Sequence, residues 1–488
     1  AVALGIEVRA CARDQQCRNQ KRGCVHDECG LAAQHIRLVQ AAPEVIVIEG
    51  PGAFGGGAIV GSVANPLTYL PIGWVARGAT VGARAGNAAK LAGLPRYATG
   101  NIRTRFITRD PRLWVFGSAF GLADGALALL RAARRLEAGR RLVWLVGNAE
   151  QARRARSLGL EWAAKDSPEG FDLTARAGVV TVTHGFGDVN RYALRGATIA
   201  QLWHGSPMKK LHADSPAALS LGPLNRFGAA RNLMREAYRR GTRRISLLPV
   251  AADAFVPFMC SAFDLTPQQV RVLGEPRTDV LFRGSPAGRR AAARELLERS
   301  VPGLVGRRAL LYAPTWRDGE PDPGIPTARQ WRRIDAFCSA TDSVLLIRPH
   351  ALGVGSYGHS SRHVHLIPPS VLPESMPLLW GIDTLITDYS SMAFDYAVTG
   401  NPLIFLAPDL EHYAATRGLY LDYPTVTGGR WRQDWDGVLD ALETLDADPA
   451  ARERAVRRSA ALAALAHRHT DGRSAKRVAR YLLELTTS

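Results

Sequence analysis

The sequence has 488 residues, which is too long for a single ordinary hydrophobic core and predicts two or three domains. Hydrophobic residues make up 46% of the chain, a composition expected of a soluble globular protein. The 62 Lys and Arg residues exceed the 44 Asp and Glu residues, and the resulting charge of +18 favours a polyanionic partner: nucleic acid, an anionic membrane face or a phosphate-rich substrate. No RRM, KH, zinc-finger or basic-zipper signature accompanies this charge, so a specific nucleic-acid partner is not expected.

Residues 1–108 lack the periodicity of the rest of the chain and are expected to form an amino-terminal extension of unknown role. Their four cysteines match neither a zinc ribbon nor a paired CxxC, although a metal site with His26 and His35 stays open: Cys11, Cys17, Cys24 and Cys29. Cys260 and Cys338 stand alone, so we expect a reducing compartment without structural disulfides. The uncharged segment 51–76 is long enough to span a bilayer, but its prolines and glycines favour a loose or membrane-touching segment.

From about residue 109, short apolar runs alternate with amphipathic helical stretches. Strands are expected at 112–118, 140–147, 177–185 and 196–205, and helices at 125–139 and 149–159. This alternation predicts a parallel, doubly wound sheet.

A basic stretch, residues 224–244, follows this first alternation. Its arginines at 226, 231, 235 and 239 are spaced so that they share roughly one face of a helix. A solvated face is one interpretation, and a surface that lies on anionic lipid is the other.

The alternation then restarts. Strands are expected at 244–250, 271–276, 308–316, 343–350, 364–369, 383–390 and 401–408, with helices at 288–299, 328–340, 391–399 and 435–445. Two more helices, at 449–467 and 472–486, close the chain. We therefore expect an α/β protein with two doubly wound, Rossmann-like domains at 109–245 and 246–430 facing a cleft, followed by carboxyl-terminal helices at 431–488.

Polar clusters lie at the ends of five of the predicted strands. They are "WHG" at 203–205, "EPRTD" at 275–279, "APTWRD" at 313–318, "RPH" at 348–350 and "TDYSS" at 387–391. Taken singly, each has a structural interpretation: a turn, an N-cap or a proline-held strand end. Because ligands of such sheets bind at the carboxyl ends of strands, the five together favour a phosphate or nucleotide-diphosphate site.

At the level of whole motifs, the sequence resembles the CDP-glycerol glycerophosphotransferases, which include teichoic-acid and capsule glycerol phosphate polymerases. The resemblance rests on "WHGSPMKKL", "GEPRTDVL", "LYAPTWRD", "LIRPH", "ITDYSSMAFDYAVTGNPLIF" and "RGLYLDY", in that order, over residues 109 to 430. The resemblance implies a GT-B-like fold and a peripheral enzyme at the cytoplasmic face of the cell membrane. This enzyme would transfer glycerol phosphate from CDP-glycerol to a lipid-linked polymer acceptor and release CMP.

Carried over residue by residue, the resemblance makes His204 and His350 the candidate catalytic residues. It also implies a substrate site formed by His204, Gly205, Ser206, Pro207, Met208, Arg277, Pro314, Thr315, Arg348, Pro349, His350, Ser390, Ser391 and Asp395. Ser206 stands where family members often have Thr, and Thr278 where they often have Asn, which makes the choice of donor less certain.

The chemistry explains why a histidine would stand at 204. The acceptor hydroxyl must lose its proton as its oxygen bonds to phosphorus, and an imidazole is suited to accept that proton. Lys209 and Lys210 would raise the local anion concentration, or are simply solvated. The interpretation needs no metal or other cofactor. A CDP-ribitol-dependent enzyme and a GT-B glycosyltransferase that uses a nucleotide sugar are the alternatives.

Overall fold

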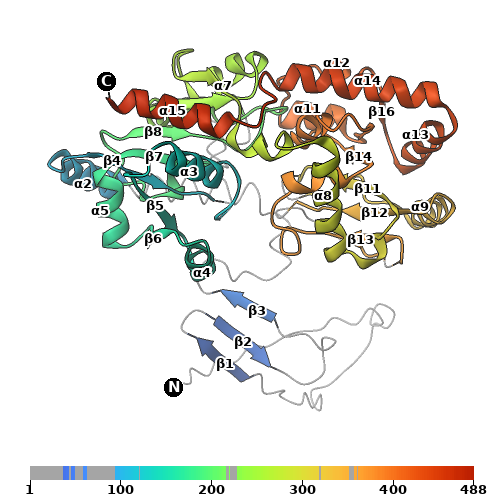
Figure 1. The fold of residues 1–488 in the computed structure, drawn as a ribbon, viewed down its shortest axis with the longest axis horizontal. Helices are drawn as coiled ribbons and strands as arrows, with labels where there is room; N and C mark the ends of the chain where they lie inside the picture. Colours follow the sequence, from blue (N-terminus) through green and yellow to red (C-terminus); the bar gives the residue numbers. More distant parts are fainter. Residues whose placement is uncertain are drawn as a thin grey trace, which may run out of the picture. The chain divides into compact units, whose positions relative to one another are not determined.

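The computed structural model describes residues 37–42, 45–49, 59–62, 94–119, 121–215, 219, 228–317, 320–350, 357–359 and 361–487 (Figure 1). The chain divides into two compact units, Ala1–Pro71 and Ile72–Ser488. The described part of the first unit is an antiparallel sheet of β1 (Arg37–Ala42), β2 (Val45–Glu49) and β3 (Ile59–Ser62). Strand β3 belongs to the uncharged segment 51–76. The rest of that segment, and the cluster of four cysteines, lie outside the described residues.

The second unit contains a seven-stranded sheet in the order β10-β9-β8-β7-β4-β5-β6, in which every neighbouring pair is parallel. Its central strands are apolar on both faces and are almost entirely buried, as a sheet covered by helices requires. The strands are β4 (Asp110–Phe116), β5 (Arg141–Val146), β6 (Glu161–Ala164), β7 (Ala177–Val182), β8 (Thr198–Gln201), β9 (Ile245–Val250) and β10 (Val270–Val272).

A second parallel sheet has six strands in the order β13-β12-β11-β14-β15-β16. The strands are β11 (Arg308–Ala313), β12 (Ser343–Ile347), β13 (Val364–Leu366), β14 (Thr384–Thr387), β15 (Leu403–Leu406) and β16 (Trp431–Arg432). In the described part of the chain, two doubly wound parallel sheets thus follow one another, which confirms the predicted α/β class of GT-B type.

Helices connect the strands and cover the sheets. They are α2 (Leu94–Arg105), α3 (Asp124–Leu136), α4 (Ala149–Ser157), α5 (Pro168–Arg176), α6 (Gly228–Thr242), α7 (Val256–Phe263), α8 (Pro286–Ser300), α9 (Ala328–Ala340), α10 (Met392–Ala397), α11 (Leu410–Thr416), α12 (Tyr423–Thr427), α13 (Trp435–Ala447), α14 (Pro449–Ala466) and α15 (Ser474–Thr487). Several of these helices begin with an N-cap side chain of the kind that marks a helix start in a sequence. One example is α9, where Thr327 and Gln330 form a capping box.

The expected domain limits differ from the structure in two places. We expected the second domain to begin at residue 246, but β9 and β10 extend the first sheet to Val272. We also expected residues up to 108 to form an extension, but α2 packs on the body, where the ring centroids of Tyr97 and Tyr192 lie 4.9 Å apart. Strand runs look alike in sequence whichever sheet they join, so hydrophobic periodicity did not reveal either limit.

The last helix returns to the first sheet. Helix α15 packs beside α3 (Figure 1) and buries Ala475, Val478, Ala479 and Leu482 in the same hydrophobic cluster. These positions follow the i, i+3, i+4, i+7 spacing of one helix face. At its amino terminus, the backbone N–H groups of Ser474 and Ala475 donate to the buried Asp279 carboxylate, at 2.7 and 3.0 Å. The chain therefore crosses from the second sheet back to the first.

Candidate active site

The segment after β8 meets the second sheet at Gly205. This residue has φ +147°, and a Cβ built there would lie 2.8 Å from Ser391 Oγ and 3.4 Å from Arg277 Nη2. Only glycine combines this backbone angle with so close an approach. The histidine-glycine turn of the first sheet and the serine pair before α10 therefore form one site.

His204 lies beside aromatic rings in this turn. Its ring centroid is 4.0 Å from that of Trp203 and 5.2 Å from that of His184, with the two imidazole planes 4° apart. Its Nδ1 is 3.5 Å from the Thr183 carbonyl oxygen, at the outer limit of a hydrogen bond. If Nδ1 carries the proton, Nε2 keeps the lone pair that a base requires.

Burial lowers the pKa of His204 to about 3, with smaller contributions from the charges of His184, Arg277 and Lys209. The imidazole is consequently neutral at pH 7 and can accept a proton, but it is a weaker base than an ordinary histidine. The charges of a bound diphosphate would move its pKa back up, because an anion stabilises the imidazolium.

His350, which follows β12, shares a cationic neighbour with His204. Burial first, and then the charge of Lys209, lower the pKa of His350 to about 4. The same lysine lowers the pKa of His204. The His350 side chain still exposes surface to solvent, and its ring lies 5.9 Å from that of Trp316. The two predicted catalytic histidines are thus close enough to feel one lysine charge.

Backbone pairing joins the predicted motifs that contain these residues. Tyr420 N–H donates to the Met208 carbonyl at 2.9 Å, and Lys210 N–H donates to the Gly418 carbonyl at 3.0 Å. The phenol of Tyr420 donates to Asp214 at 2.7 Å. Pro207 and Met208 are buried beneath this pairing. The segment after β8 is therefore fixed by the "RGLYLDY" segment of the second sheet.

A buried ionic network holds the next part of the site. Arg277 donates to both oxygens of Asp395 at 2.9 Å and, through Nε, to Glu275 at 2.7 Å. Burial opposes its charge, but Asp395 and Glu275 outweigh that cost and raise the pKa of Arg277 above its usual range. Ser206 donates to Glu275 at 3.1 Å, so the turn that holds His204 is bonded to the same network.

Thr315 presents a buried hydroxyl that has no partner in the described part of the chain. Its backbone N–H donates to both oxygens of Asp388, at 2.9 and 3.0 Å, and the residue is 3% exposed. Among the described residues, nothing bonds to its Oγ1. A buried hydroxyl without a partner costs free energy, so this atom is suited to contact a ligand. Pro314 precedes it and is buried as well.

Comparison with known proteins identifies the family. The model of the CDP-glycerol:poly(glycerophosphate) glycerophosphotransferases matches residues 102–484. The chain belongs to this family.

Curated relatives agree with that assignment. The chain is 29% identical over 255 residues to the teichoic acid ribitol-phosphate polymerase TarL of Staphylococcus aureus, a match that covers 52% of this chain and 43% of the relative. It is 25% identical over 308 residues to a teichoic acid ribitol-phosphate primase of Bacillus spizizenii, covering 60% and 72%. It is 28% identical over 256 residues to a teichoic acid poly(glycerol phosphate) polymerase of Staphylococcus epidermidis, covering 51% and 34%. The chain thus spans less than half the length of these two polymerases.

A solved structure supports the fold. The wall teichoic acid polymerase TagF superposes with a TM-score of 0.64 at 21% identity, covering 85% of this chain and 98% of that chain. At this identity the likeness concerns the fold alone.

Two arginines that the family resemblance put at the donor site are held by protein groups. Arg277 is bound by carboxylates, as described above. Arg348 donates to the carbonyls of Ile367, Leu372 and Pro373 at 3.0, 2.7 and 3.2 Å, and Pro349 follows it. These contacts give Arg277 and Arg348 positioning roles around the site. Their direct contact with a donor stays a prediction.

Only one of the two serines before α10 bonds through its side chain to the backbone of that helix. Ser390 Oγ accepts from Met392 N–H at 3.3 Å, whereas the Ser391 side chain caps no backbone group of α10. Because α10 has only 6 residues, its dipole contributes little to anion binding. In this geometry the Ser391 hydroxyl, beside Gly205, is the group that faces the seven-stranded sheet.

Sequence reasoning missed two residues of the site. His184 follows β7 as His204 follows β8, and the repeated histidine-glycine after adjacent strands was the available signal. Asp124 begins α3 with φ +61°, next to Gly125, whose added Cβ would lie 3.5 Å from Arg277 N. Burial, together with Glu275, raises the pKa of Asp124 to about 6, although Arg277 opposes the shift. No local pattern marked this aspartate.

Within the described residues, no three His, Cys, Asp or Glu side chains are grouped so that they could hold a metal ion. No helix in that part of the chain is long and apolar enough to cross a membrane.

Proposed function

We propose that this protein transfers glycerol phosphate from CDP-glycerol to a hydroxyl of a lipid-linked polymer of the teichoic-acid or capsule type. The observation that carries the proposal is the meeting of His204-Gly205 with Ser391, in a site where Lys209 acts on both His204 and His350. Family membership supplies the class of reaction.

In the proposed step, the acceptor oxygen bonds to the phosphorus that bears the glycerol. The bond from that phosphorus to the bridging oxygen breaks, and its electron pair leaves with CMP. His204 takes the hydroxyl proton, since its imidazole is neutral at pH 7. Lys209, His350 and the buried Thr315 hydroxyl would bind the diphosphate, which places positive charge and a donor where negative charge develops.

A second candidate donor is CDP-ribitol. The two first curated relatives, TarL and TarK of Staphylococcus aureus, are both named as ribitol-phosphate polymerases, at 29% and 32% identity. Glycerol and ribitol differ only in the length of the alditol, so the same diphosphate contacts serve both.

The test is release of CMP or UDP by the purified protein when it is given CDP-glycerol, CDP-ribitol or UDP-sugars with a soluble acceptor bearing alditol phosphate. We expect CMP from CDP-glycerol. Release from CDP-ribitol alone would establish the second candidate, and release of UDP would establish a glycosyltransferase. No release from any donor, with a folded protein, would contradict the proposal.

We further propose that the basic stretch 224–244 brings the enzyme to anionic lipid, because a lipid-linked acceptor stays in the membrane. Support from the structure is limited to α6. Of the four predicted arginines, Arg226 lies outside the described residues. Arg235 is half-buried, and Arg239 lies 3.7 Å from the Asp264 carboxylate, which reduces the charge it offers to lipid.

We expect the protein to pellet with anionic vesicles at low salt and to dissociate as salt rises. Glutamine at positions 226, 231, 235 and 239 should weaken pelleting, by about 1 kcal/mol for each arginine that reaches lipid. The matched control replaces four exposed arginines elsewhere, at 154, 299, 452 and 457. Equal pelleting of both variants would exclude α6 as the anchor.

A further inference from the structure

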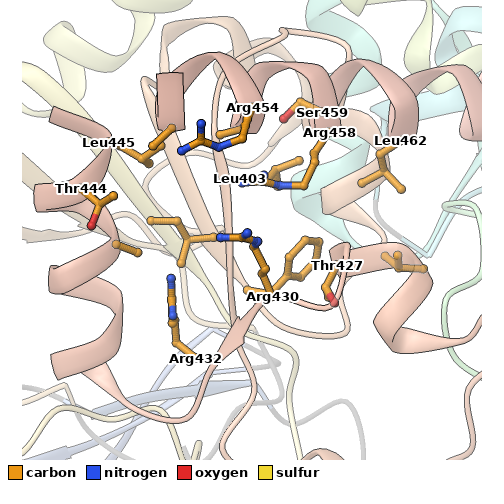
Figure 2. A pocket seen from close by; sticks show the side chains of 16 residues that line it. Leu403, Thr427, Arg430, Arg432, Thr444, Leu445, Arg454, Arg458, Ser459 and Leu462 are labelled. Carbon is orange, nitrogen blue, oxygen red and sulfur yellow. The ribbon is translucent and has the colours of Figure 1, made fainter. Parts of the chain in front are cut away.

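A cavity of about 120 Å³ is lined by residues other than those of the candidate active site. It is lined by residues of β15, β16, α12, α13 and α14 (Figure 2). Four arginines line it: Arg430, Arg432, Arg454 and Arg458. None of its lining residues belongs to the site around His204. The family resemblance gave no role to any of these arginines.

Local periodicity explains why these arginines converge. Arg430 and Arg432 are two residues apart at β16, so their side chains leave the same side of an extended chain. Arg454 and Arg458 are four residues apart on α14, which puts them one turn apart on one helix face. Figure 2 shows the side chains of Arg430, Arg454 and Arg458 directed toward one another.

The positive charge of this cavity is poorly balanced by the described residues. Arg454 lies 3.1 Å from Asp448, but both side chains are about half exposed and such pairs are weak. No carboxylate in the described chain forms an ion pair with Arg430, Arg432 or Arg458. Burial and the charges of the other three arginines lower the pKa of Arg458. Like charges at this spacing are costly unless an anion lies between them.

The other polar groups of the cavity cannot donate to an anion. The hydroxyls of Thr427, Thr444 and Ser459 give their protons to the carbonyls of Tyr423, Asp440 and Asn401, at 2.9, 2.7 and 2.7 Å. The arginines are therefore the donors that face the cavity. Its floor is apolar, with Phe405 and Leu462 buried, and apolar walls strengthen ionic contacts by excluding water.

We propose that this arginine pocket, defined by Arg430, Arg432, Arg454 and Arg458, binds phosphoester anions at a second site of the protein. Guanidinium forks match the oxygens of a phosphate, and four of them require more negative charge than one carboxylate carries. The cavity is small beside ordinary ligand pockets of roughly 300–1,000 Å³. It therefore has room for a phosphoryl group or two, either of a free phosphate or of a phosphodiester chain whose remainder stays outside.

The test is calorimetric titration with two probes, inorganic diphosphate and a soluble glycerol phosphate oligomer. The Arg430→Gln/Arg458→Gln protein is compared with an Arg452→Gln/Arg457→Gln control, which removes the same charge from exposed positions. We expect the pocket variant to lose roughly tenfold or more in affinity, as loss of charge-assisted hydrogen bonds predicts. The control should keep its affinity. The active site is unchanged in both proteins, so the difference between them reports the pocket.

The probe whose binding is weakened identifies the source of the phosphate. Weaker binding of diphosphate alone indicates a free anion, and weaker binding of the oligomer indicates a phosphodiester chain. If the double variant fails to fold, the same titrations are made with the single, exposed Arg430→Gln variant, and Arg452→Gln is its control. Equal affinities of pocket variant and wild type for both probes would overturn the proposal. Equal weakening in the control would overturn it as well, because the effect would then be one of net charge.

Discussion

The candidate active site and the arginine pocket use the same side chain in opposite ways. Around the active site, Arg277 and Arg317 are each 5% exposed in their side chains and are bound by two carboxylates. In the pocket, Arg430, Arg432 and Arg458 line one cavity instead, with no carboxylate of the described chain paired to them. A paired arginine positions the protein around it, whereas arginines that repel one another are suited to hold an anion.

The difference follows from the cost of burial. A guanidinium removed from water needs a compensating charge, so the buried arginines have acidic partners that are far away in sequence. The pocket arginines keep part of their hydration, because Arg430 and Arg454 are exposed. They can therefore remain charged without a protein partner until a ligand binds.

The largest expected effect concerns His204, because it is the proposed catalytic base, whereas the arginine pocket is proposed only to bind. His204→Ala should lower turnover by roughly 10²- to 10⁴-fold, the usual contribution of a positioned base. Donor affinity by calorimetry should be largely kept. His412→Ala, at a side chain that is 60% exposed on α11, is the control and should keep normal turnover. Near-normal turnover of His204→Ala would show that His204 is not the general base.

Breaking the buried network should cost most in stability. Arg277→Gln leaves the Asp395 and Glu275 side chains, 2% and 4% exposed, without their cation. We expect a loss of about 3–5 kcal/mol in the free energy of unfolding, measured in urea. Arg299→Gln breaks a pair whose side chains are 66% and 67% exposed and should cost less than about 1 kcal/mol. Similar losses in both variants would show that Arg277 is not held as described.

A pH effect of intermediate size is expected at Asp124. Its pKa of about 6 in the folded protein exceeds the roughly 3.9 of an unfolded chain. Between these values the folded state binds more protons, so stability should fall as pH rises from about 4 to 6 and stay lower above that range. Asp124→Asn should abolish this fall, which is about 3 kcal/mol for a shift of this size.

Urea midpoints from pH 4 to 8 measure this slope, with Asp172→Asn on the exposed face of α5 as the control. Both proteins should unfold reversibly at each pH. If the slope of Asp124→Asn matches that of the control, the aspartate is not desolvated beside Glu275.

The smallest expected effect has the opposite sign and belongs to the pocket. Arg458→Gln should raise the free energy of unfolding by less than about 1 kcal/mol at low salt, because it relieves repulsion among the arginines. The gain should shrink as the Debye length falls from about 30 Å at 0.01 M salt to about 8 Å at 0.15 M. Arg452→Gln, exposed on the same helix, should show no such gain. A loss of several kcal/mol in Arg458→Gln would mean that the arginine supports the fold.

The sequence by itself determined the alternation of strands and helices, because period-2 and period-3.6 patterns arise from contacts between near neighbours. It also located the polar groups at strand ends, and its motifs predicted the family, which the family model over residues 102–484 confirms. The sequence pattern did not predict short or weakly patterned elements, such as β6 with 4 residues and β16 with 2. The sequence could not indicate that β9 and β10 complete the first sheet.

Only the tertiary structure decided what each charged side chain meets. Arg277 and Asp395 are 118 positions apart, and their pairing turns an expected donor contact into a buried network. The close approach of Gly205 to Ser391, the low pKa of His204 and the meeting of β16 with α14 also depend on how the elements pack. Electrostatic energies depend on distance and on exclusion of water, and neither quantity is present in a linear chain until it has folded.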